Sequence, residues 1–382
     1  DIAERVLQML EGAMHELRIG DPRDLATDVG PVIDAEARDQ LLEHIERMRA
    51  AGLRVIQTTL PAACANGTFV PPTLVELDHL DRLQHEVFGP VLHVLRFDRD
   101  ELPALIDAIN ATGYGLTHGI QSRIDETVDA IVARVRAGNI YVNRNIIGAV
   151  VGVQPFGGTG LSGTGPKAGG PLYLRRLVRR SAVDSTESSV AAMEPLLRAA
   201  LATMIAATVS VPAAERARLA AGFNAELPHV APVHATALGV KLPGPTGESN
   251  SWSVRPRGEI ACVADSDLAL LEQIVLVVGS GNRVLLQTSA LASFAAAALG
   301  PRHCRVVDDL LAPAPGALLV AGPPAMVRNW RERAAAGEGA ILPVIARRSE
   351  GGYDRDRLVA ERVVTVNTTA SGGNTELLAV SG

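Results

Sequence analysis

Short apolar runs of strand type alternate with helical segments in two stretches of this 382-residue chain, and this alternation restricts its fold more than any other feature. In the first stretch we expect helices at residues 1–17, 34–50, 101–110 and 125–136, and strands at residues 55–58, 73–77, 91–97 and 139–143. Strands interleaved with helices predict an α/β fold in which helices cover a sheet.

A second βα series follows a glycine- and proline-rich stretch. Its expected strands are residues 259–263, residues 283–287 and two runs around Leu318 and Leu342, with helices at residues 268–278 and 291–299 and two alanine-rich helices after Ser189. This series predicts a second, doubly wound sheet of Rossmann-like type. The polar segment SAVDSTESS, residues 181–189, is the expected domain boundary, which gives domains at residues 1–183 and 184–365.

Charge and cysteine content exclude several classes of function. A net charge of -6 leaves no basic field for nucleic acid or an anionic membrane surface. Three widely separated cysteines favour neither a disulfide framework nor a zinc knuckle, so a reducing cytoplasm fits best. Nine histidines occur without ligand spacing, and we expect no metal site. The longest apolar helical stretch, residues 199–209, is too short to cross a bilayer.

A glycine-framed loop follows the strand expected at residues 139–143. The string GNIYVNRNIIGAVVGVQPFGG, residues 138–158, ends in a stretch framed by Gly148 and Gly158 that carries Phe156 and no ionisable side chain. A turn of this kind offers backbone N–H groups, which can hold a small anion or a carbonyl oxygen. We therefore expect a site that grips a carboxylate without a charged side chain, although an ordinary glycine-rich turn with a buried Phe remains the alternative.

Three further strings support a family resemblance. HEVFGPVL at residues 85–92, INATGYGLTHGI at residues 109–120 and VNTTASGGNTELLAVSG at residues 366–382 accompany the loop. Together they resemble the glutamate-semialdehyde dehydrogenase half of the bifunctional proline utilization A (PutA) family, an aldehyde dehydrogenase fused to a proline dehydrogenase. The resemblance covers nearly the whole chain and implies that residues 366–382 form a β-hairpin flap over an internal cavity.

The resemblance assigns roles to five residues. Glu86 would accept hydrogen bonds from the ribose hydroxyls of NAD, and Phe88 would pack at the nicotinamide ring. Gly148 and Ala149 would bind the substrate carboxylate through their amides, and Phe156 would contact the aliphatic part of the aldehyde. Without the resemblance, Glu86 is an ordinary solvated residue before a Gly-Pro turn and Phe88 a core side chain.

The nucleophile of the resembled enzymes has no match in this chain. In those enzymes a cysteine thiolate attacks the aldehyde, a hydride passes to NAD⁺, and water hydrolyses the thioester. Cys64, Cys262 and Cys304 lack a neighbouring base or a matching motif, so we expect the nucleophile upstream of Asp1 and no catalytic residue here. The chain alone is expected to be inactive.

The second sheet departs from the cofactor domain that it resembles. Gln287 stands where a lysine normally contacts the adenosine ribose, and Asp265 and Ser266 replace a Pro-Trp-Asn turn, so we expect no NAD there. Gly158, Gly160 and Gly163 spell G-x-G-x-x-G, but the following TGPKAGGP cannot begin a helix. We interpret this string as a false dinucleotide fingerprint.

The resemblance implies a complete pathway for the parent protein. An FAD domain would oxidise proline, and the hydrolysed semialdehyde would be oxidised to glutamate with NAD⁺ beside the missing N-terminal domains of the same polypeptide. Homo-oligomerisation and contact of the parent with the inner membrane stay open. Two alternatives remain: another NAD(P)-dependent aldehyde dehydrogenase fused to an unrelated domain, and a non-catalytic scaffold from residue 187 onward that seals a cavity or replaces a dimer contact.

Overall fold

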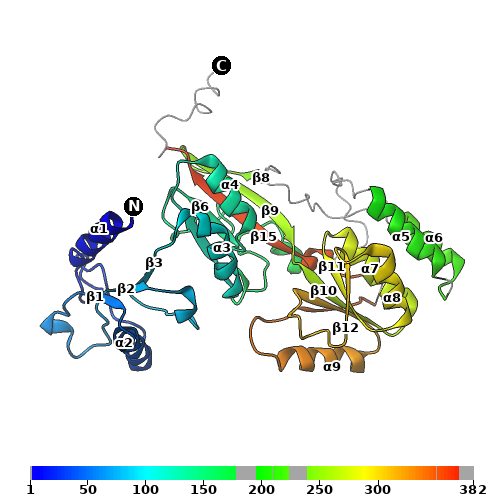
Figure 1. The fold of residues 1–382 in the computed structure, drawn as a ribbon, viewed down its shortest axis with the longest axis horizontal. Helices are drawn as coiled ribbons and strands as arrows, with labels where there is room; N and C mark the ends of the chain where they lie inside the picture. The colour runs from blue at the N-terminus through cyan, green and yellow to red at the C-terminus, as the bar shows by residue number, and fades with distance from the viewer. Residues whose placement is uncertain (1, 178–194, 209, 223–238, 350, 370–382) are drawn as a thin grey trace, which may run out of the picture. The chain divides into compact units, whose positions relative to one another are not determined.

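The computed structural model describes residues 2–177, 195–208, 210–222, 239–349 and 351–369. The chain divides into two compact units, Asp1–Thr112 and Gly113–Gly382 (Figure 1). The expected boundary at residues 181–189 lies outside the described residues, as does most of the expected flap, from residue 370 onward. The division at residue 183 therefore stays a prediction.

The first unit packs helices against a three-stranded sheet. Its helices and strands are α1 (Ala3–His15), α2 (Ala35–Ala50), β1 (Arg54–Gln57), β2 (Thr73–Leu77), β3 (Val91–Leu95) and α3 (Leu102–Ala111). β1 is antiparallel and β3 parallel to the central strand β2. Asp34 starts α2 by accepting a hydrogen bond from the Ala37 N–H at 2.8 Å. The core forms where Leu41, Ile45 and Met48 of α2 meet the sheet.

The second unit contains an all-parallel sheet in the order β12-β11-β10-β13-β14. Its strands are β10 (Glu259–Ala264), β11 (Arg283–Gln287), β12 (Cys304–Val307), β13 (Ala317–Ala321) and β14 (Val344–Ala346). In chain order this is a 3-2-1-4-5 sheet, the doubly wound arrangement that the sequence predicts. The α/β fold class is thus confirmed.

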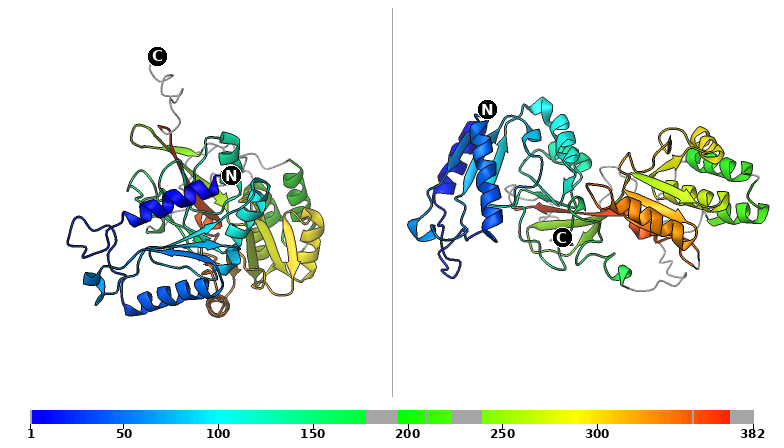
Figure 2. Two further views of the ribbon diagram at one scale, coloured as in Figure 1. Left: turned by 60° about the vertical axis from the view of Figure 1, so that its left-hand side comes forward. Right: turned by 90° about the horizontal axis from the view of Figure 1, so that it is seen from below.

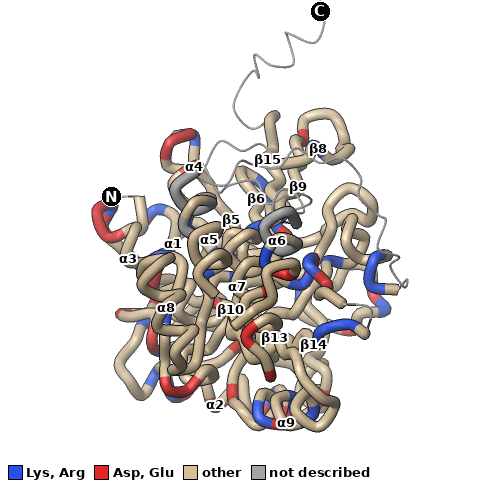
Figure 3. The backbone as a smooth tube through the Cα atoms, turned by 90° about the vertical axis from the view of Figure 1, so that its right-hand side faces the viewer, with Lys and Arg blue, Asp and Glu red and all other residues tan. Residues whose placement is uncertain are grey.

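Helices cover both faces of this parallel sheet (Figure 1). They are α5 (Pro195–Ala207), α6 (Ala213–Gly222), α7 (Asp267–Gly279), α8 (Ala290–Leu299) and α9 (Pro324–Ala335). Alternate residues of β10 point to opposite faces: Ile260 and Cys262 join the core beneath α5, α7 and α8, and Ala261 joins the core with Trp330 of α9. Figure 3 shows basic and acidic positions together on α9. This helix buries Trp330 against the sheet, and its charged residues face away from the core.

A second five-stranded sheet has the order β5-β6-β15-β9-β8. Its strands are β5 (Thr117–Ile120), β6 (Asn139–Val142), β8 (Val240–Leu242), β9 (Glu248–Pro256) and β15 (Val359–Asn367), with α4 (Asp125–Arg134) between β5 and β6. β15, the long red strand in both views of Figure 2, is parallel to β6 and antiparallel to β9. Strands from both sides of the predicted domain boundary therefore share one sheet.

Shorter elements lie between these helices and strands along the chain. They are the ribbon of β4 (Tyr114–Gly115) and β7 (Thr159–Gly160) and the 3₁₀ turns η1 (Ala62–Cys64), η2 (Leu80–Arg82), η3 (Arg99–Glu101), η4 (Leu174–Arg176) and η5 (Arg355–Leu358). No helix begins in residues 164–173, so the glycines at 158–163 open a turn and not a nucleotide-binding helix, as predicted. Every helix in the described ranges is too short or too polar to traverse a bilayer.

Candidate functional site

The glycine-framed loop leaves β6 through a left-handed residue, Asn143, whose φ is 57°. The Asn143 side chain fixes this turn to Ser122: its Nδ2 donates to the Ser122 carbonyl at 2.9 Å, and its Oδ1 accepts from the Ser122 N–H at 3.0 Å. Asn tolerates this backbone region better than most residues with a Cβ. The loop therefore starts from a fixed point close to the end of β5.

The tip of the loop presents two adjacent amides. Gly148 has a φ of 75°, and a Cβ there would meet no atom within 4 Å, so glycine is needed for conformation and not for space. The next amide along, Val150 N–H, donates to Gln154 Oε1 at 3.1 Å. For the amides of Gly148 and Ala149, the described part of the chain supplies no acceptor. Both donors are thus available to a ligand.

Glu248 holds the loop to the sheet from the first residue of β9. Its carboxylate accepts from Arg144 Nη1 and, at 2.7 Å, from Gln154 Nε2, and Asn250 Nδ2 donates to it at 2.9 Å. The side chains of Glu248 and Arg144 are only 13% and 18% exposed. Charge-assisted hydrogen bonds are strong where water is scarce. Glu248 therefore restrains both ends of the loop and, through Gln154, the backbone at its tip.

Asn139 of β6 organises the chain that follows the loop. Its Nδ2 donates to the Pro155 carbonyl at 2.9 Å, while its Oδ1 accepts from the Gly157 N–H at 3.2 Å and from Lys167 Nζ at 2.7 Å. Phe156, between these contacts, exchanges two backbone hydrogen bonds with Ala168, of 3.0 and 2.8 Å. The backbone that carries the half-buried Phe156 ring is consequently held on both sides.

Lys167 is a fully buried lysine in this network, with 2% of its surface exposed. Burial is the main cause that lowers the pKa of its amine to about 8, and the Glu361 carboxylate acts in the opposite direction. Glu361 Oε2 accepts from the Lys167 N–H at 2.7 Å, and its Oε1 accepts from Trp252 Nε1 at 3.0 Å. Because the Lys167 amine donates to Asn139 and to the Gly157 carbonyl, it positions the loop.

The other predicted residues lie in the first unit, in the segment between η2 and β3. Val87 packs into the core around α2, and Gly89 is so close to that helix that a Cβ would clash with the Leu41 side chain. Phe88, which lies between Val87 and Gly89, is 84% exposed. Glu86, which directly precedes Val87, is exposed as well. The alternative that Phe88 is a core side chain is therefore wrong. An exposed carboxylate and an exposed aromatic face are suited to a diol and a flat ring.

The three cysteines are all buried. Burial raises the pKa of the Cys304 thiol to about 11 and raises that of Cys262 further. Cys64 directs its sulfur toward the Ile19 carbonyl at 3.8 Å. Because the thiolate is the reactive form, these are environments of structural thiols. Among the described residues, no group of three or more His, Cys, Asp or Glu side chains is arranged to hold a metal ion.

The carboxyl edge of the parallel sheet is where doubly wound folds bind nucleotides. Here exposed Asp265 follows β10, and Ser266 starts α7 by accepting from the Ala269 N–H at 3.4 Å. Gln287, the last residue of β11, donates to the Asp308 carbonyl at 3.1 Å. Asp265 thus directly precedes the N-terminus of a helix, where doubly wound folds hold a pyrophosphate, and the expectation that this sheet binds no NAD stays a prediction.

Comparison with known proteins shows what the chain is similar to. Residues 1–183 match the model of the aldehyde dehydrogenase family. Over its whole length the chain is 43% identical to the bifunctional protein PutA of Salmonella typhimurium, and over 94% of its length it is 42% identical to that of Rhizobium meliloti. The match is with the C-terminal part of these longer proteins, of which the chain spans about 30%.

Two further proteins are similar to parts or nearly all of this chain. A 1-pyrroline-5-carboxylate dehydrogenase of Geobacillus kaustophilus is 39% identical over 46% of this chain and 33% of its own length. The solved PutA of Corynebacterium freiburgense covers 95% of this chain and is covered over 34% of its own length, with a TM-score of 0.61 and 24% identity, which shows a common fold. The aldehyde dehydrogenase segment contains the whole glycine-framed loop, whereas Glu248 and Glu361 lie beyond it.

Sequence reasoning missed the residues that hold this aldehyde dehydrogenase loop. The composition of the chain could have pointed to Lys167, which is one of only two lysines among 36 basic residues, because a rare lysine in an arginine-rich chain invites a specific explanation. Glu248 had no local signal, since it lies 94 residues from Gln154 along the chain. Only the shared sheet brings these two side chains together.

Proposed function

We propose that this chain supplies the substrate-anchoring loop and part of the cofactor-facing surface of an NAD-dependent L-glutamate γ-semialdehyde dehydrogenase. The parent would be bifunctional and would also carry an FAD-containing proline dehydrogenase part. The observation that carries the proposal is the pair of available amides at Gly148 and Ala149, on a restrained loop, in a chain similar throughout to bifunctional PutA proteins.

The loop would bind the acid end of the substrate. The N–H groups of Gly148 and Ala149 donate to the carboxylate, and Phe156 contacts the methylene groups between the carboxylate and the aldehyde. Donors that are fixed before binding lose little conformational freedom, so the restraint by Glu248 and Asn139 increases affinity. A loop without charged side chains at its tip also leaves the aldehyde free of competing amines.

The exposed pair in the first unit would hold the cofactor. Glu86 accepts hydrogen bonds from two ribose hydroxyls, and Phe88 offers its face to the nicotinamide. NAD⁺, when bound, supplies the acceptor for the hydride that leaves the substrate. The remaining chemistry, including the nucleophilic cysteine, would come from other domains of the same polypeptide, in a cytoplasmic and homo-oligomeric protein.

The test is semialdehyde oxidation by the full-length protein with Phe156→Ala. We expect kcat/KM for L-glutamate γ-semialdehyde to fall about tenfold or more, because the truncation removes apolar contact worth roughly 1.5–3 kcal/mol. Phe294→Ala, on the 40%-exposed Phe of α8, is the matched control. Undiminished kcat/KM in the Phe156 variant would refute the assignment of this ring to the substrate.

A simple aldehyde distinguishes the leading proposal from the alternative of another NAD(P)-dependent aldehyde dehydrogenase fused to a scaffold. If amides at the loop tip hold a carboxylate, butanal, which has none, is a much poorer substrate than the semialdehyde. Equal kcat/KM values for the two aldehydes would favour the alternative.

A further inference from the structure

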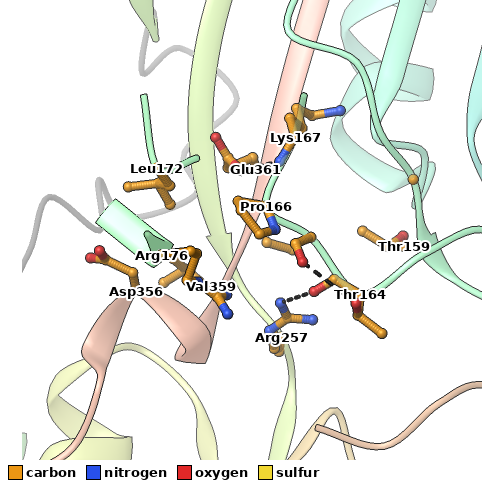
Figure 4. Close-up of a pocket in the computed structure, with 13 residues that line it drawn as sticks. Thr159, Thr164, Pro166, Lys167, Leu172, Arg176, Arg257, Asp356, Val359 and Glu361 are labelled. Atoms are coloured by element: carbon orange, nitrogen blue, oxygen red, sulfur yellow. Dashed lines mark hydrogen bonds between the residues drawn. The ribbon is translucent and has the colours of Figure 1, made fainter. Parts of the chain in front are cut away.

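A small cavity lies in the second unit, where three segments of the chain meet. The glycine-rich stretch that includes Thr164, the β9–β10 turn with Arg257, and the segment from η5 into β15 surround it (Figure 4). It has a volume of about 10 Å³, space for the centre of one water-sized atom. Arg176 of η4 completes the lining on the side of Asp356.

Positive charge gathers around this cavity. Arg257 donates through Nε to the Arg357 carbonyl at 2.7 Å and through Nη2 to the Thr164 carbonyl at 2.8 Å, so both acceptors are neutral. Burial first, and then the neighbouring guanidinium groups of Arg176 and Arg357, lower the pKa of Arg257 to about 10. Burial and Arg176 also lower the pKa of Arg357. The guanidinium groups of Arg176 and Arg357 thus destabilise the charged form of Arg257.

The nearby carboxylates offset only part of this charge: Glu361 favours the charged form of Arg257, and Asp354 favours that of Arg357. Glu361 accepts from the Lys167 N–H and from Trp252, and Asp356 Oδ1 lies 3.6 Å from Nη1 of Arg175. Within the described residues, none of Arg176, Arg257 and Arg357 forms an ion pair. The Nε of Arg176 is buried and has no hydrogen-bond partner in that part of the chain. A buried donor without an acceptor is costly, so an acceptor supplied by a ligand would stabilise this site.

We propose that this cavity binds a small oxyanion, one oxygen of which enters the space between Arg176 and Arg257 and accepts from both guanidinium groups. An anion satisfies the orphaned Nε and offsets the repulsion among the three arginines, whereas a water molecule would do only the first. Inorganic phosphate and the carboxylate of a small organic acid share this chemistry. The occupant would join the glycine-rich stretch, the β9–β10 turn and η5 into one rigid group.

The test is calorimetric titration of the full chain with inorganic phosphate and, separately, with L-glutamate, at constant ionic strength set by KCl. We expect one saturable site and a loss of affinity of about tenfold or more in Arg176→Gln, because a hydrogen bond to a charged group is removed. Arg305→Gln, which removes the same charge from an exposed ion pair with Glu259, should bind as the unmodified chain does.

Thermal unfolding without added anion gives a second readout. Arg176→Gln should leave the midpoint unchanged or raise it, since the substitution relieves repulsion, and phosphate should then stabilise this variant less than the unmodified chain. Phosphate binding that weakens in Arg176→Gln identifies an inorganic ligand, and glutamate binding that weakens in the same variant identifies a carboxylate. Glutamate binding that Arg176→Gln leaves unchanged belongs to the loop with Gly148 and Ala149. Absence of saturable binding of both, or equal affinity in Arg176→Gln, would overturn the proposal.

Discussion

Glu248→Gln tests whether the restrained loop matters for substrate binding. The substitution keeps the size of the side chain but replaces one carboxylate oxygen by an amide N–H, so the bond from Arg144 is lost while Gln154 keeps an acceptor. Arg144, 18% exposed, is then left with an unpaired charge. One charge-assisted hydrogen bond contributes roughly 1.5–3 kcal/mol, and about 2 kcal/mol corresponds to a change of about thirtyfold in an equilibrium constant.

Without the Arg144–Glu248 hydrogen bond, the loop is less ordered before substrate binds. The free energy needed to order it is then subtracted from the free energy of substrate binding. We therefore expect KM for glutamate semialdehyde to rise by up to about thirtyfold in the full-length protein, with kcat changed much less. Steady-state kinetics measures both constants, and hydrogen exchange of residues 144–155 reports the mobility of the loop.

Glu259→Gln is the matched control. Glu259 also forms ion pairs with two arginines, with Arg283 at 3.1 Å and with Arg305 at 3.3 Å, but it lies in the parallel sheet. This variant should show the unmodified KM. An unchanged KM in Glu248→Gln, or equal effects of the two substitutions, would refute the reasoning. In a double-mutant cycle, Arg144→Met should add little to Glu248→Gln, because both remove the same contact.

Two further predictions concern pH. The pKa of Lys167 falls from 10.5 to about 8 on folding. Between these two pH values the unfolded chain binds a proton that the folded chain lacks. The free energy of unfolding therefore rises with pH across this window, by up to roughly 3 kcal/mol. Urea unfolding at about pH 7.5 and about pH 10 should show this rise reduced in Lys167→Met. Burial first, and then His44, lower the pKa of His93 to about 4, so its contribution to stability is present above about pH 6.5 and is lost as the pH falls toward 4. Thermal unfolding across that range should have a shallower acid slope in His93→Gln, and an identical slope would contradict the assignment.

Local pattern predicted some of the regular elements well, although β12 and α9 were not predicted. The strands expected at residues 73–77 and 283–287 are β2 and β11 with the same ends, and the helix expected at residues 34–50 is α2 with one residue less. These segments have a clear apolar period and polar or glycine residues at their ends, so their information is local. The parallel sheet follows from the regular alternation of such segments.

The pairing of strands that lie far apart in the sequence could not be predicted from the local pattern. β9 has the polar sequence ESNSWSVRP and was not predicted, although all its residues from Glu248 to Pro256 pair with β15. In α1, only Leu7 is buried, while Val6, Met9 and Leu10 stay exposed, so the helix was predicted but its packed face was not. Strand pairing and face burial depend on partners distant in sequence, which a local pattern does not contain.

The same pairing explains why the anchoring loop depends on the second half of the chain. All four residues of β6 are buried because β5 flanks one edge and β15 the other, with Val363 paired to Asn139. Asn139 then directs its amide to the chain after the loop, while β9, the next strand beyond β15, places Glu248 at the ends of the loop. Without β9 and β15, β6 would be an edge strand with unpaired backbone groups, and the loop would lose both Glu248 and Glu361. The geometry that presents the Gly148 and Ala149 amides is therefore a property of the whole five-stranded sheet and not of the aldehyde dehydrogenase segment alone.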